Sequence, residues 1–577
     1  MNRETTVVNL SPVNWPTGEY EQLMAAQSVD RTKAGEATGS KGAVTVAYNG
    51  LAARAGLEAL KQGGSAVDAA LTAALAQVVL TAGAPISFFG IMSMVCYDAA
   101  TNKVVTMNGE WNTVKGETEP MTIPGSIAFG SLEALKGSGA PSGRTALVGG
   151  FMKGVEAAHK RFGKLPFAAL FEPAIYVAEN GMPVNPLVAQ AIDMRKDDLS
   201  RLPATKAVFT KKDGSFYQEG DLFKQPELAR TLRKIAADGN ADHMYKGAWG
   251  EKLIAALKAD GGKMTMEDLA AYEVLWSDPA VCELANGYAL HMSQAPNLGT
   301  ANLVEALNLA EVANLAADGP WWKSGKSLRK ASEITQQFGV AFLPDALLGQ
   351  MYAGLDFSFD GRLKKSHAEE LWKRMEAGVK MARFKPRGIQ HSDDVVAVDA
   401  AGNMCAITHS INCVNWGKTA IFVDGISIAD AASYQQAQIA RVKPGERLPA
   451  PTEQGILFKD GKPLLAFASM GAGLHHRSFA CLFSVMKFGM GVVEAIDAPD
   501  FYMPKYDLKT MEVTLAVPEK RFDHRVLDDT GFKWEEVPLE EARLGGEGKW
   551  VAISRDPKSG KLEAGSHNRN NSAAVAY

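Results

Sequence analysis

Long apolar runs, long basic runs and paired cysteines are all missing from this chain of 577 residues. No uncharged apolar stretch reaches the roughly 18 residues that a membrane-spanning helix needs, so we expect no membrane partner. The formal net charge is only −4 and the basic residues are dispersed, which argues against nucleic acid as the main partner. The first residues lack the basic start and apolar core of a secretory signal, and we therefore expect a cytoplasmic protein.

The cysteines are too few and too scattered for a disulfide framework. There are 5 of them, no two form a Cys-x-x-Cys pair, and an odd number fits reduced, buried thiols. For Cys405 and Cys413 we expect packing rather than catalysis. His475 and His476 are adjacent, and adjacent residues of a helix point to different sides, which argues against a metal site. We expect neither a metal nor a cofactor.

The composition is that of a large globular protein, with 46% hydrophobic residues to build a core. Residues 1–40 are typical of a polar extension, and residues 320–385 of charged helices. Trp321, Trp322 and Trp372 lie among lysines and arginines in the second of these segments. Aromatic and basic residues together can bind nucleic acid, but a solvated helical face is the more common origin and is our prediction.

The pattern with the most chemical content begins at Ser392. Two short apolar runs flank a turn sequence at residues 399–403, where glycine and asparagine tolerate a positive φ. This pattern predicts a β-hairpin. Antiparallel pairing would place Ser392, at the start of the first strand, opposite Ser410 and Asn412 near the end of the second. On this pattern alone, a serine before a strand is usually an ordinary loop residue.

The same stretch resembles the processing site of the γ-glutamyltranspeptidase family, T-T-H-x-S-V-V-D-x-x-G-N-A-V-x-x-T-x-T-x-N. Aligned without a gap, Ser392 falls on the family's nucleophilic threonine, Ser410 on its second hydroxyl residue and Asn412 on its supporting asparagine. Residues 55–70 are similar to A-x-x-G-L-x-I-L-x-x-G-G-N-A-V-D-A-A, and the resemblance runs from about residue 41 to residue 577. Serine in place of threonine is a departure that other N-terminal nucleophile hydrolases share.

The resemblance implies an α/β (α+β) fold, a four-layer αββα sandwich formed by two fragments of one precursor. The peptide bond between His391 and Ser392 would be cut. A large fragment, residues 41–391, would follow the extension of residues 1–40. The small fragment, residues 392–577, would start with the nucleophile. The two fragments would associate, and a homodimer of such units is left open.

The implied chemistry needs a base, because a neutral serine hydroxyl is a poor nucleophile. The α-amine that cleavage frees on Ser392 has an ordinary pKa of about 7.7–8.0 and would accept the hydroxyl proton. In the family, two consecutive backbone N–H groups of a glycine-rich turn hold the oxyanion, and Gly471 and Ala472 stand there. Ser410 and Asn412 would orient the hydroxyl and the amine.

The positions at which the family recognises a glutamyl group differ in this chain. Where the family has an arginine for the α-carboxylate, this chain has Glu110, which would repel a carboxylate. Ser433 stands at the aspartate that binds the α-amine, and Ala450 and Pro451 stand at a pair of serines. His475 and the two residues after it are predicted to be surface residues at the start of a helix, with contact to an anionic substrate group as the alternative.

These expectations combine into one function. We expect an autoprocessing amidohydrolase or acyltransferase that cleaves a small amide other than a standard γ-glutamyl peptide through an acyl-enzyme on Ser392. Two alternatives stay open: a γ-glutamyl transferase or hydrolase with altered substrate recognition, and an unprocessed relative that only binds. The residues name neither the amide nor the acceptor, which could be water or an amine.

Overall fold

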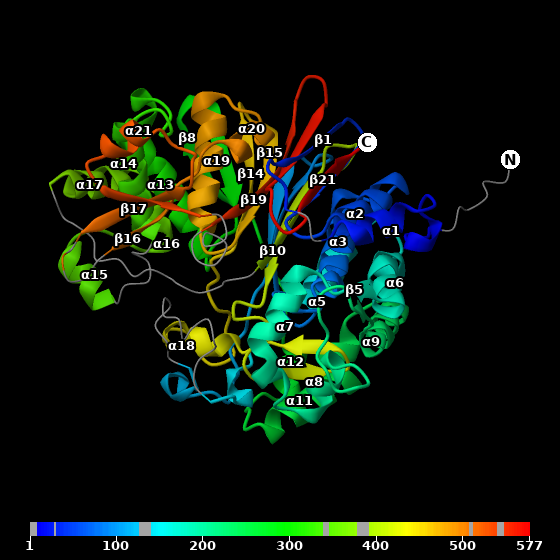
Figure 1. The fold of residues 1–577 in the computed structure, drawn as a ribbon. Coiled ribbons are helices and arrows are strands. Elements are labelled where there is room, and N and C mark those ends of the chain that lie inside the picture. The colour runs from blue at the N-terminus through cyan, green and yellow to red at the C-terminus, as the bar shows by residue number, and fades with distance from the viewer. Residues whose placement is uncertain are drawn as a thin grey trace.

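The computed structural model describes residues 8–27, 30–125, 140–338, 345–377, 392–506, 510, 512–538 and 547–577. His391, on one side of the predicted cleavage site, lies outside these residues. Within the described part, two seven-stranded sheets lie face to face between two layers of helices (Figure 1).

Sheet 1 contains the predicted nucleophile, and its strand order is β21-β2-β10-β11-β3-β4-β7. In that order the strands are Ala573–Ala576, Ala43–Val46, Ser392–Val398, Met404–Ser410, Ile91–Asp98, Lys103–Gly109 and Leu275–Ser277. Sheet 2 has the order β1-β20-β19-β15-β14-β9-β8. Its strands are Gly35–Gly39, Leu562–Ser566, Lys549–Arg555, Lys462–Met470, Glu453–Lys459, Tyr288–Met292 and Ala280–Leu284.

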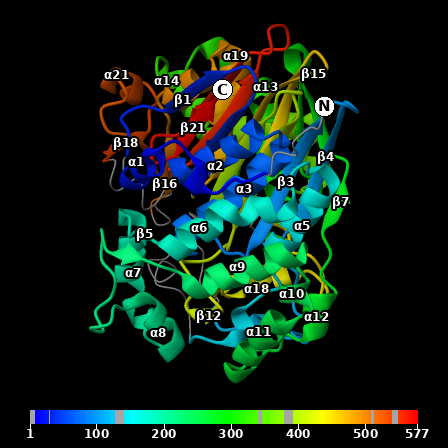
Figure 2. The same ribbon diagram turned by 90° about the vertical axis from the view of Figure 1, so that its right-hand side faces the viewer.

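Three apolar clusters show how the layers pack. One fills the space between the sheets and contains Val396 and Ala406 from sheet 1 and Ala466 and Val551 from sheet 2. Because side chains alternate along a strand, the other face of each sheet packs on helices. Sheet 1 packs on α2 (Gly50–Lys61), α3 (Ala66–Leu80), α5 (Phe151–Phe162) and α6 (Glu172–Asn180), which face the viewer in Figure 2. Sheet 2 packs on α13 (Leu298–Val312), α17 (Lys365–Glu376), α19 (Leu474–Phe488) and α20 (Val492–Asp497). The expected αββα sandwich is confirmed.

The remaining elements surround these layers. The other helices are α1 (Glu19–Ala25), α7 (Pro186–Leu199), α8 (Pro203–Phe209), α9 (Pro226–Asp238), α10 (Asp242–Tyr245), α11 (Ala248–Ala259), α12 (Met266–Ala270), α14 (Gly325–Thr335), α15 (Asp345–Met351), α16 (Phe359–Arg362), α18 (Gln436–Ile439) and α21 (His524–Asp528). Small sheets pair β5 (Met182–Pro183) with β6 (Leu222–Phe223), β12 (Ile421–Val423) with β13 (Ile426–Ile428), and β17 (Val513–Pro518) with both β16 (Tyr502–Tyr506) and β18 (Lys533–Val537). Across the described ranges, no helix has the length and apolar character required to cross a bilayer.

Local sequence explains why the central helices form where they do. Ser65 and Asp68 make a capping box at the start of α3, each side chain bonding the other's backbone N–H. Every residue of α3 is buried, as its almost entirely apolar sequence predicts. Gly56 of α2 lies so close to α3 that a Cβ there would stand 2.8 Å from the carbonyl oxygen of Ala69. A side chain at this glycine would therefore push the two helices apart.

The predicted hairpin is confirmed as β10 and β11. Its turn is held by Asp399, whose Oδ1 accepts hydrogen bonds from the N–H groups of Ala401 and Asn403, both at 3.0 Å. Gly402 has a φ of +88°, a conformation that glycine adopts without strain. The turn fixes the register, so that Ser392 pairs directly with Ser410 at the open end of the hairpin.

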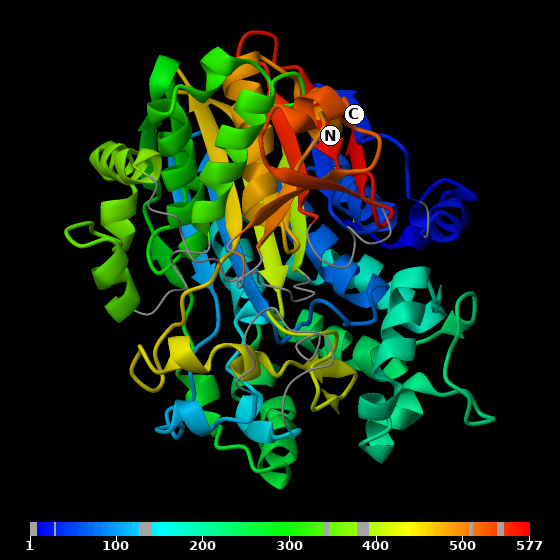
Figure 3. The ribbon, with the colours of Figure 1, turned by 60° about the vertical axis from the view of Figure 1, so that its left-hand side comes forward.

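Segments from before and after Ser392 share both sheets. In sheet 1, β2 from before Ser392 pairs with β10, which begins at Ser392. In sheet 2, β9 from before Ser392 pairs with β14 from after it. Figure 3 shows the consequence, because strands drawn in blue, green, yellow and red lie side by side. The two predicted fragments are therefore interleaved through both sheets rather than folded as separate domains.

Two expectations from the sequence were wrong. Residues 35–39 belong to the sandwich as the edge strand β1, paired with β20, and not to an extension. Their sequence, Gly-Glu-Ala-Thr-Gly, has no alternation of large apolar side chains that would indicate a strand. Trp321 and Trp372 are buried in the core on the helix side of sheet 2, with 1% and 8% of their surface exposed, so that segment is not simply a solvated face. Lys373, next to Trp372 on α17, is exposed, whereas Trp321 lies in a turn before α14.

Candidate active site

Two hydroxyl groups meet at the open end of the β10–β11 hairpin. The Ser392 hydroxyl donates a hydrogen bond to the Ser410 Oγ at 3.1 Å, and the Asn412 N–H donates to the same Ser410 Oγ at 3.0 Å. Asn412 has a φ of +49°, which asparagine tolerates better than most residues. The structure thus brings together the predicted nucleophile and both residues expected to orient it.

A buried carboxyl lies two residue pairs further along the hairpin. Asp394 is on the same face of β10 as Ser392, and its Oδ1 accepts a hydrogen bond from Thr408 at 2.8 Å. Its Oδ2 has no hydrogen-bond partner among the described residues. Burial raises the pKa of Asp394 well above its ordinary value, Glu453 raises it further, and Thr408 and Lys549 oppose the shift. The residue behind the nucleophile therefore favours its neutral form. The alternation of side chains along the strand could have indicated it, because it stands two positions after Ser392.

The glycine-rich turn at residues 471–473 lies at the same end of the sandwich. In sheet 2, Glu453 pairs with Ser469 and Lys549 pairs with Met470, the last residue of β15. Strand β10 packs against β15 and β19 across the sandwich, and the charges of Glu453 and Lys549 both act on Asp394, so the end of β15 faces the start of β10. Gly471 follows with a φ of +89°, and a Cβ there would stand 2.9 Å from the Glu547 carbonyl oxygen. The turn therefore lies at the end of the sandwich that holds Ser392, and the role of the Gly471 and Ala472 N–H groups stays a prediction.

Glu110 lies on the side of β3 away from Ser392. Ser93 of β3 is paired with Thr408 of β11, and its hydroxyl donates to the Glu110 Oε1. Thr452 donates to the same oxygen at 3.1 Å. Burial raises the pKa of Glu110 to about 7, although the two hydroxyl donors and the Arg447 charge oppose the shift. Glu110 itself could be found from the sequence, but its partners could not, since they lie far away along the chain.

The other three residues predicted to recognise the substrate are Ser433, Ala450 and Pro451. Ser433 is buried, in a 3-10 turn that packs with Ile411, so it borders the end of the hairpin. Its N–H donates to the Asp430 carbonyl at 2.9 Å, and its hydroxyl has no hydrogen-bond partner within the described ranges. Ala450 is buried and its carbonyl accepts from Leu298 at 3.0 Å, while Pro451 is partly exposed. The roles of these three residues toward substrate stay predictions.

A buried chain of hydrogen bonds, the Glu453–His367 network, runs behind the glycine turn into the helices beside sheet 2. It contains Glu453, His475, Asn302, Arg362, Glu305 and His367. Arg362 donates to the Asn302 Oδ1 at 2.7 Å, so the Asn302 amide nitrogen faces His475 at 3.1 Å. The His475 Nε2 must then accept, and its Nδ1 donates to Glu453 at 2.8 Å. The fixed tautomer of His475 ties the first turn of α19 to β14.

The surface placement predicted for His475 and its neighbours was wrong. His476 and Arg477 are buried, with 2% and 7% of their surface exposed, and the His475 side chain is mostly covered. The Arg477 guanidinium contacts Asp500 at 3.2 Å and the Ile496 carbonyl. Little in the sequence could have warned of this, because the partners on α13, β14 and the segment around residue 500 are distant in the chain.

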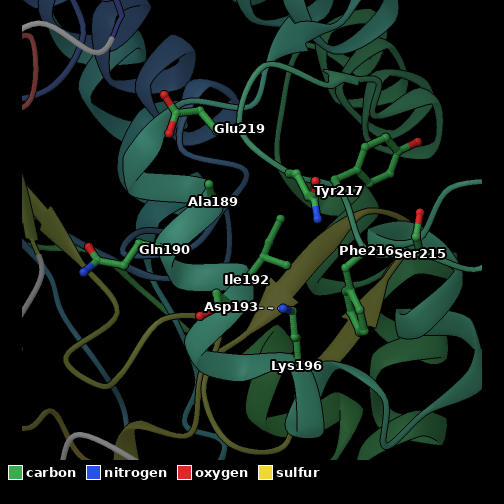
Figure 4. Close-up of a pocket in the computed structure, with 10 residues that line it drawn as sticks. Ala189, Gln190, Ile192, Asp193, Lys196, Ser215, Phe216, Tyr217 and Glu219 are labelled. Carbon is green, nitrogen blue, oxygen red and sulfur yellow. Dashed lines mark hydrogen bonds and ion pairs between the residues drawn. The ribbon is translucent and has the colours of Figure 1, made fainter.

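An open pocket elsewhere holds none of these residues. It is lined by Ala189, Gln190, Ile192, Asp193, Lys196 and residues 215–219, between α7 and a neighbouring loop (Figure 4). Asp193 and Lys196 form an exposed ion pair across one turn of α7. Such a pair stabilises little and has no chemistry of its own. In the ranges that the structure describes, no group of three or more His, Cys, Asp or Glu side chains is placed to hold a metal ion.

Known proteins with similar sequences show which family this chain belongs to. The Gamma-glutamyltranspeptidase family model matches residues 52–577. The chain belongs to the γ-glutamyltranspeptidase family. This γ-glutamyltranspeptidase-family protein is 25% identical over 570 residues to the "Glutathione hydrolase proenzyme" of Bacillus subtilis (strain 168), covering 93% of this chain and 92% of that protein. It is 25% identical over 504 residues to the "Acylase ACY 1 proenzyme" of Pseudomonas sp. (strain SE83), covering 84% and 86%.

A solved structure supports the fold of this family member. The cephalosporin acylase from Bacillus halodurans superimposes with a TM-score of 0.75 at 22% identity, covering 95% of this chain and 98% of that one. The likeness shows that the whole sandwich is shared. Membership of the family makes the protein an N-terminal nucleophile hydrolase of the amidohydrolase and acyltransferase class.

Proposed function

We propose that this protein is cut before Ser392 and then hydrolyses, or transfers the acyl group of, a small amide through an acyl-enzyme on the Ser392 hydroxyl. One observation carries the proposal. Ser392 begins a strand, and its hydroxyl faces the Ser410 Oγ at 3.1 Å, at the end of the sandwich where the glycine turn lies. An N-terminal residue in that place would have its own α-amine beside its own hydroxyl.

The steps follow from these positions. In the uncut chain the Ser392 hydroxyl attacks the carbonyl carbon of His391, and the C–N bond breaks as an ester forms, which frees the α-amine. Water then hydrolyses the ester, which restores the Ser392 hydroxyl and leaves a carboxylate on His391. In catalysis this amine, whose ordinary pKa is about 7.7–8.0, takes the hydroxyl proton. The oxygen then adds to the amide carbonyl and the N–H groups of Gly471 and Ala472 bind the oxyanion. Each such donor contributes roughly 3–4 kcal/mol in known cases. The amine returns the proton to the leaving nitrogen, and water or another amine accepts the acyl group.

Purified protein should run as two bands on a denaturing gel. N-terminal sequencing of the smaller band should begin Ser-Asp-Asp-Val, the residues from 392 onward. The physical reason is that only the cut supplies a proton acceptor next to the hydroxyl. An active preparation that contains a single uncut chain would rule out the proposal.

Standard γ-glutamyl substrates should be poor. Glu110 is a buried carboxylate, and a glutamyl α-carboxylate next to it would meet repulsion instead of a bidentate partner. Processed enzyme should therefore turn over γ-glutamyl-p-nitroanilide at least about tenfold more slowly than its best substrate in a panel of small amides followed by ammonia or nitroaniline release. A γ-glutamyl rate equal to the best of the panel would contradict the substrate class and leave the mechanism intact.

A further inference from the structure

Glu110 is a buried carboxyl with one oxygen in use and one without a partner. Only 1% of its surface is exposed. Its Oε1 accepts from the hydroxyls of Ser93 and Thr452, and its Oε2 has no hydrogen-bond partner in the part of the chain that the structure describes. A buried carboxylate with an unpaired oxygen is costly, and such groups are normally satisfied by a donor or a cation.

The charged groups around Glu110 do not satisfy it. Arg447 is near enough to influence the carboxyl, but its guanidinium donates to Asn108, Asn112 and the Glu273 carbonyl and stacks on Tyr272 at 4.7 Å. The Tyr272 hydroxyl donates to the backbone carbonyl of Glu110 and not to its side chain. Ser93 and Thr452, from the neighbouring strand and from the loop before β14, bear no charge. Among the described residues, the free oxygen therefore has no cation of its own.

The free oxygen lies at a useful distance from the nucleophile. Ser93, the partner of Glu110, is paired with Thr408, which bonds Asp394, two residues after Ser392 on the same strand. Two strand spacings of about 4.8 Å separate β10 from β3, and Ser93 is level with Asp394, about 7 Å along the strand from Ser392. The Glu110 carboxyl therefore lies on the order of 10–12 Å from the Ser392 hydroxyl. An acyl chain of four or five carbons that ends in an amine spans about this length once the new ester bond and one hydrogen bond are added.

We propose that Glu110 binds a cationic amine carried by the acyl part of the substrate, about four atoms from the carbonyl carbon that Ser392 attacks. This inference rests on the proposed function and narrows it to amides of short amino acids that lack a carboxylate beside the amine. The ammonium supplies donors and positive charge to the unpaired oxygen, and the pair forms where water is excluded. An uncharged acyl chain leaves the oxygen unpaired, and a carboxylate chain adds a second negative charge.

Three p-nitroanilides that share their first four acyl carbons test the proposal: 4-aminobutyryl, butyryl and glutaryl. They place an ammonium, a methyl group or a carboxylate near Glu110 and share the scissile bond. Processed enzyme at pH 8 should show a kcat/KM for 4-aminobutyryl roughly 10- to 100-fold above butyryl, the range for a hydrogen bond to a charged group, with glutaryl the slowest. A blank without enzyme removes spontaneous ring closure of the aminobutyryl compound. A 4-aminobutyryl to butyryl ratio of one or less overturns the proposal.

The same ratio should depend on pH. The pKa of Glu110 is raised to about 7, so its carboxyl is mostly neutral at pH 6 and mostly ionised at pH 8. The substrate amine stays protonated over this range. The ratio should therefore rise severalfold from pH 6 to pH 8. Titration of the Ser392 amine changes the kcat/KM of both substrates by the same factor, so it cancels in the ratio. A change in the protonation of Asp394 cancels in the same way. A ratio that is flat or falls across this range counts against Glu110 as the binding group.

Glu110→Gln provides the variant. It keeps the two hydroxyl contacts but removes the charge, so the ratio should fall toward one and lose its pH dependence. Glu172→Gln is the matched control, because Glu172 is a partly buried carboxyl bonded by the Leu10 N–H in the helical layer beside sheet 1, and it should keep the wild-type ratio. If Glu110→Gln does not fold, the pH dependence of the wild-type ratio decides. An unchanged ratio in folded Glu110→Gln overturns the assignment.

Calorimetry separates this inference from the proposed function. 4-Aminobutyramide and butyramide can be titrated into the purified protein without need for turnover. Tighter binding of the amine at pH 8 than at pH 6, lost in Glu110→Gln, supports the amine site even if no anilide is cleaved, and in that case only the catalytic proposal fails. If all three anilides are cleaved at similar rates, the catalytic proposal stands and the amine site at Glu110 is ruled out.

Discussion

Replacing Ser392 by alanine should leave the chain uncut and remove amide turnover, with a loss of at least about 10³-fold. Both effects have one physical cause, because the same hydroxyl attacks the preceding carbonyl during processing and the substrate carbonyl afterwards. The hydroxyl is held by Ser410 at 3.1 Å, and Ser392 is the residue paired with Ser410 across the hairpin. The measurements are denaturing electrophoresis and the rate with the best amide of a panel.

Two further variants make this result specific. Ser392→Thr keeps a hydroxyl at the same place and should still be cut, since only a methyl group is added. Ser559→Ala changes an exposed serine whose hydroxyl bonds Asp556 in a turn far from the hairpin in sequence, and it should be processed and active like the wild type. Cleavage of Ser392→Ala at the same bond, or full activity of this variant, would show that another group does the chemistry.

Replacing Arg362 by methionine should cost roughly 3–5 kcal/mol of the free energy of unfolding. Arg362 and Glu305 bond at 2.7 Å with 2% and 1% of their side chains exposed. Burial alone would raise the pKa of Glu305, but Arg362 and His367 hold it below its ordinary value, so the carboxylate is charged in the folded protein. Removing the cation leaves a buried charge whose remaining side-chain partner is a histidine. Urea unfolding followed by circular dichroism would measure the loss.

A matched surface pair serves as the control. Arg233 and Glu179 bond at 2.6 Å, but 58% and 39% of their side chains are exposed. Arg233→Met should therefore cost about 1 kcal/mol or less. The double variant Arg362→Met/Glu305→Gln should recover stability relative to Arg362→Met alone, because it removes the stranded charge. Equal losses in the buried and exposed single variants would refute the idea that burial makes this pair important.

The Glu453–His367 network connects the buried ion pair of Arg362 to the glycine turn beside Ser392. Arg362 orients Asn302, and Asn302 fixes the tautomer of His475 at the start of α19, directly after the glycine turn. In an Arg362 variant that still folds, Asn302 would no longer be oriented, and only Glu453 would still hold His475 next to the turn that is predicted to bind the oxyanion. Sequence reasoning found the turn itself but placed His475 at the surface, because the residues that bury it lie on other helices.

The sequence was most informative where a structure depends on neighbours a few positions apart. The capping boxes of Ser65 with Asp68 and of Thr265 with Asp268 join residues three positions apart. The turn held by Asp399 uses residues two and four positions away. Hydrogen bonds of this range follow from local residue types, so the helices, the hairpin and its register could be predicted from the chain alone.

By itself, the sequence determined the family pattern, the hairpin that presents Ser392, and the change from arginine to Glu110. Only the tertiary structure decided what surrounds Glu110 and His475. Glu110 meets Thr452 across 342 positions and His475 meets Asn302 across 173. These contacts depend on how two sheets and two helical layers stack, and stacking is set by the burial of the whole apolar surface rather than by any local residue pattern.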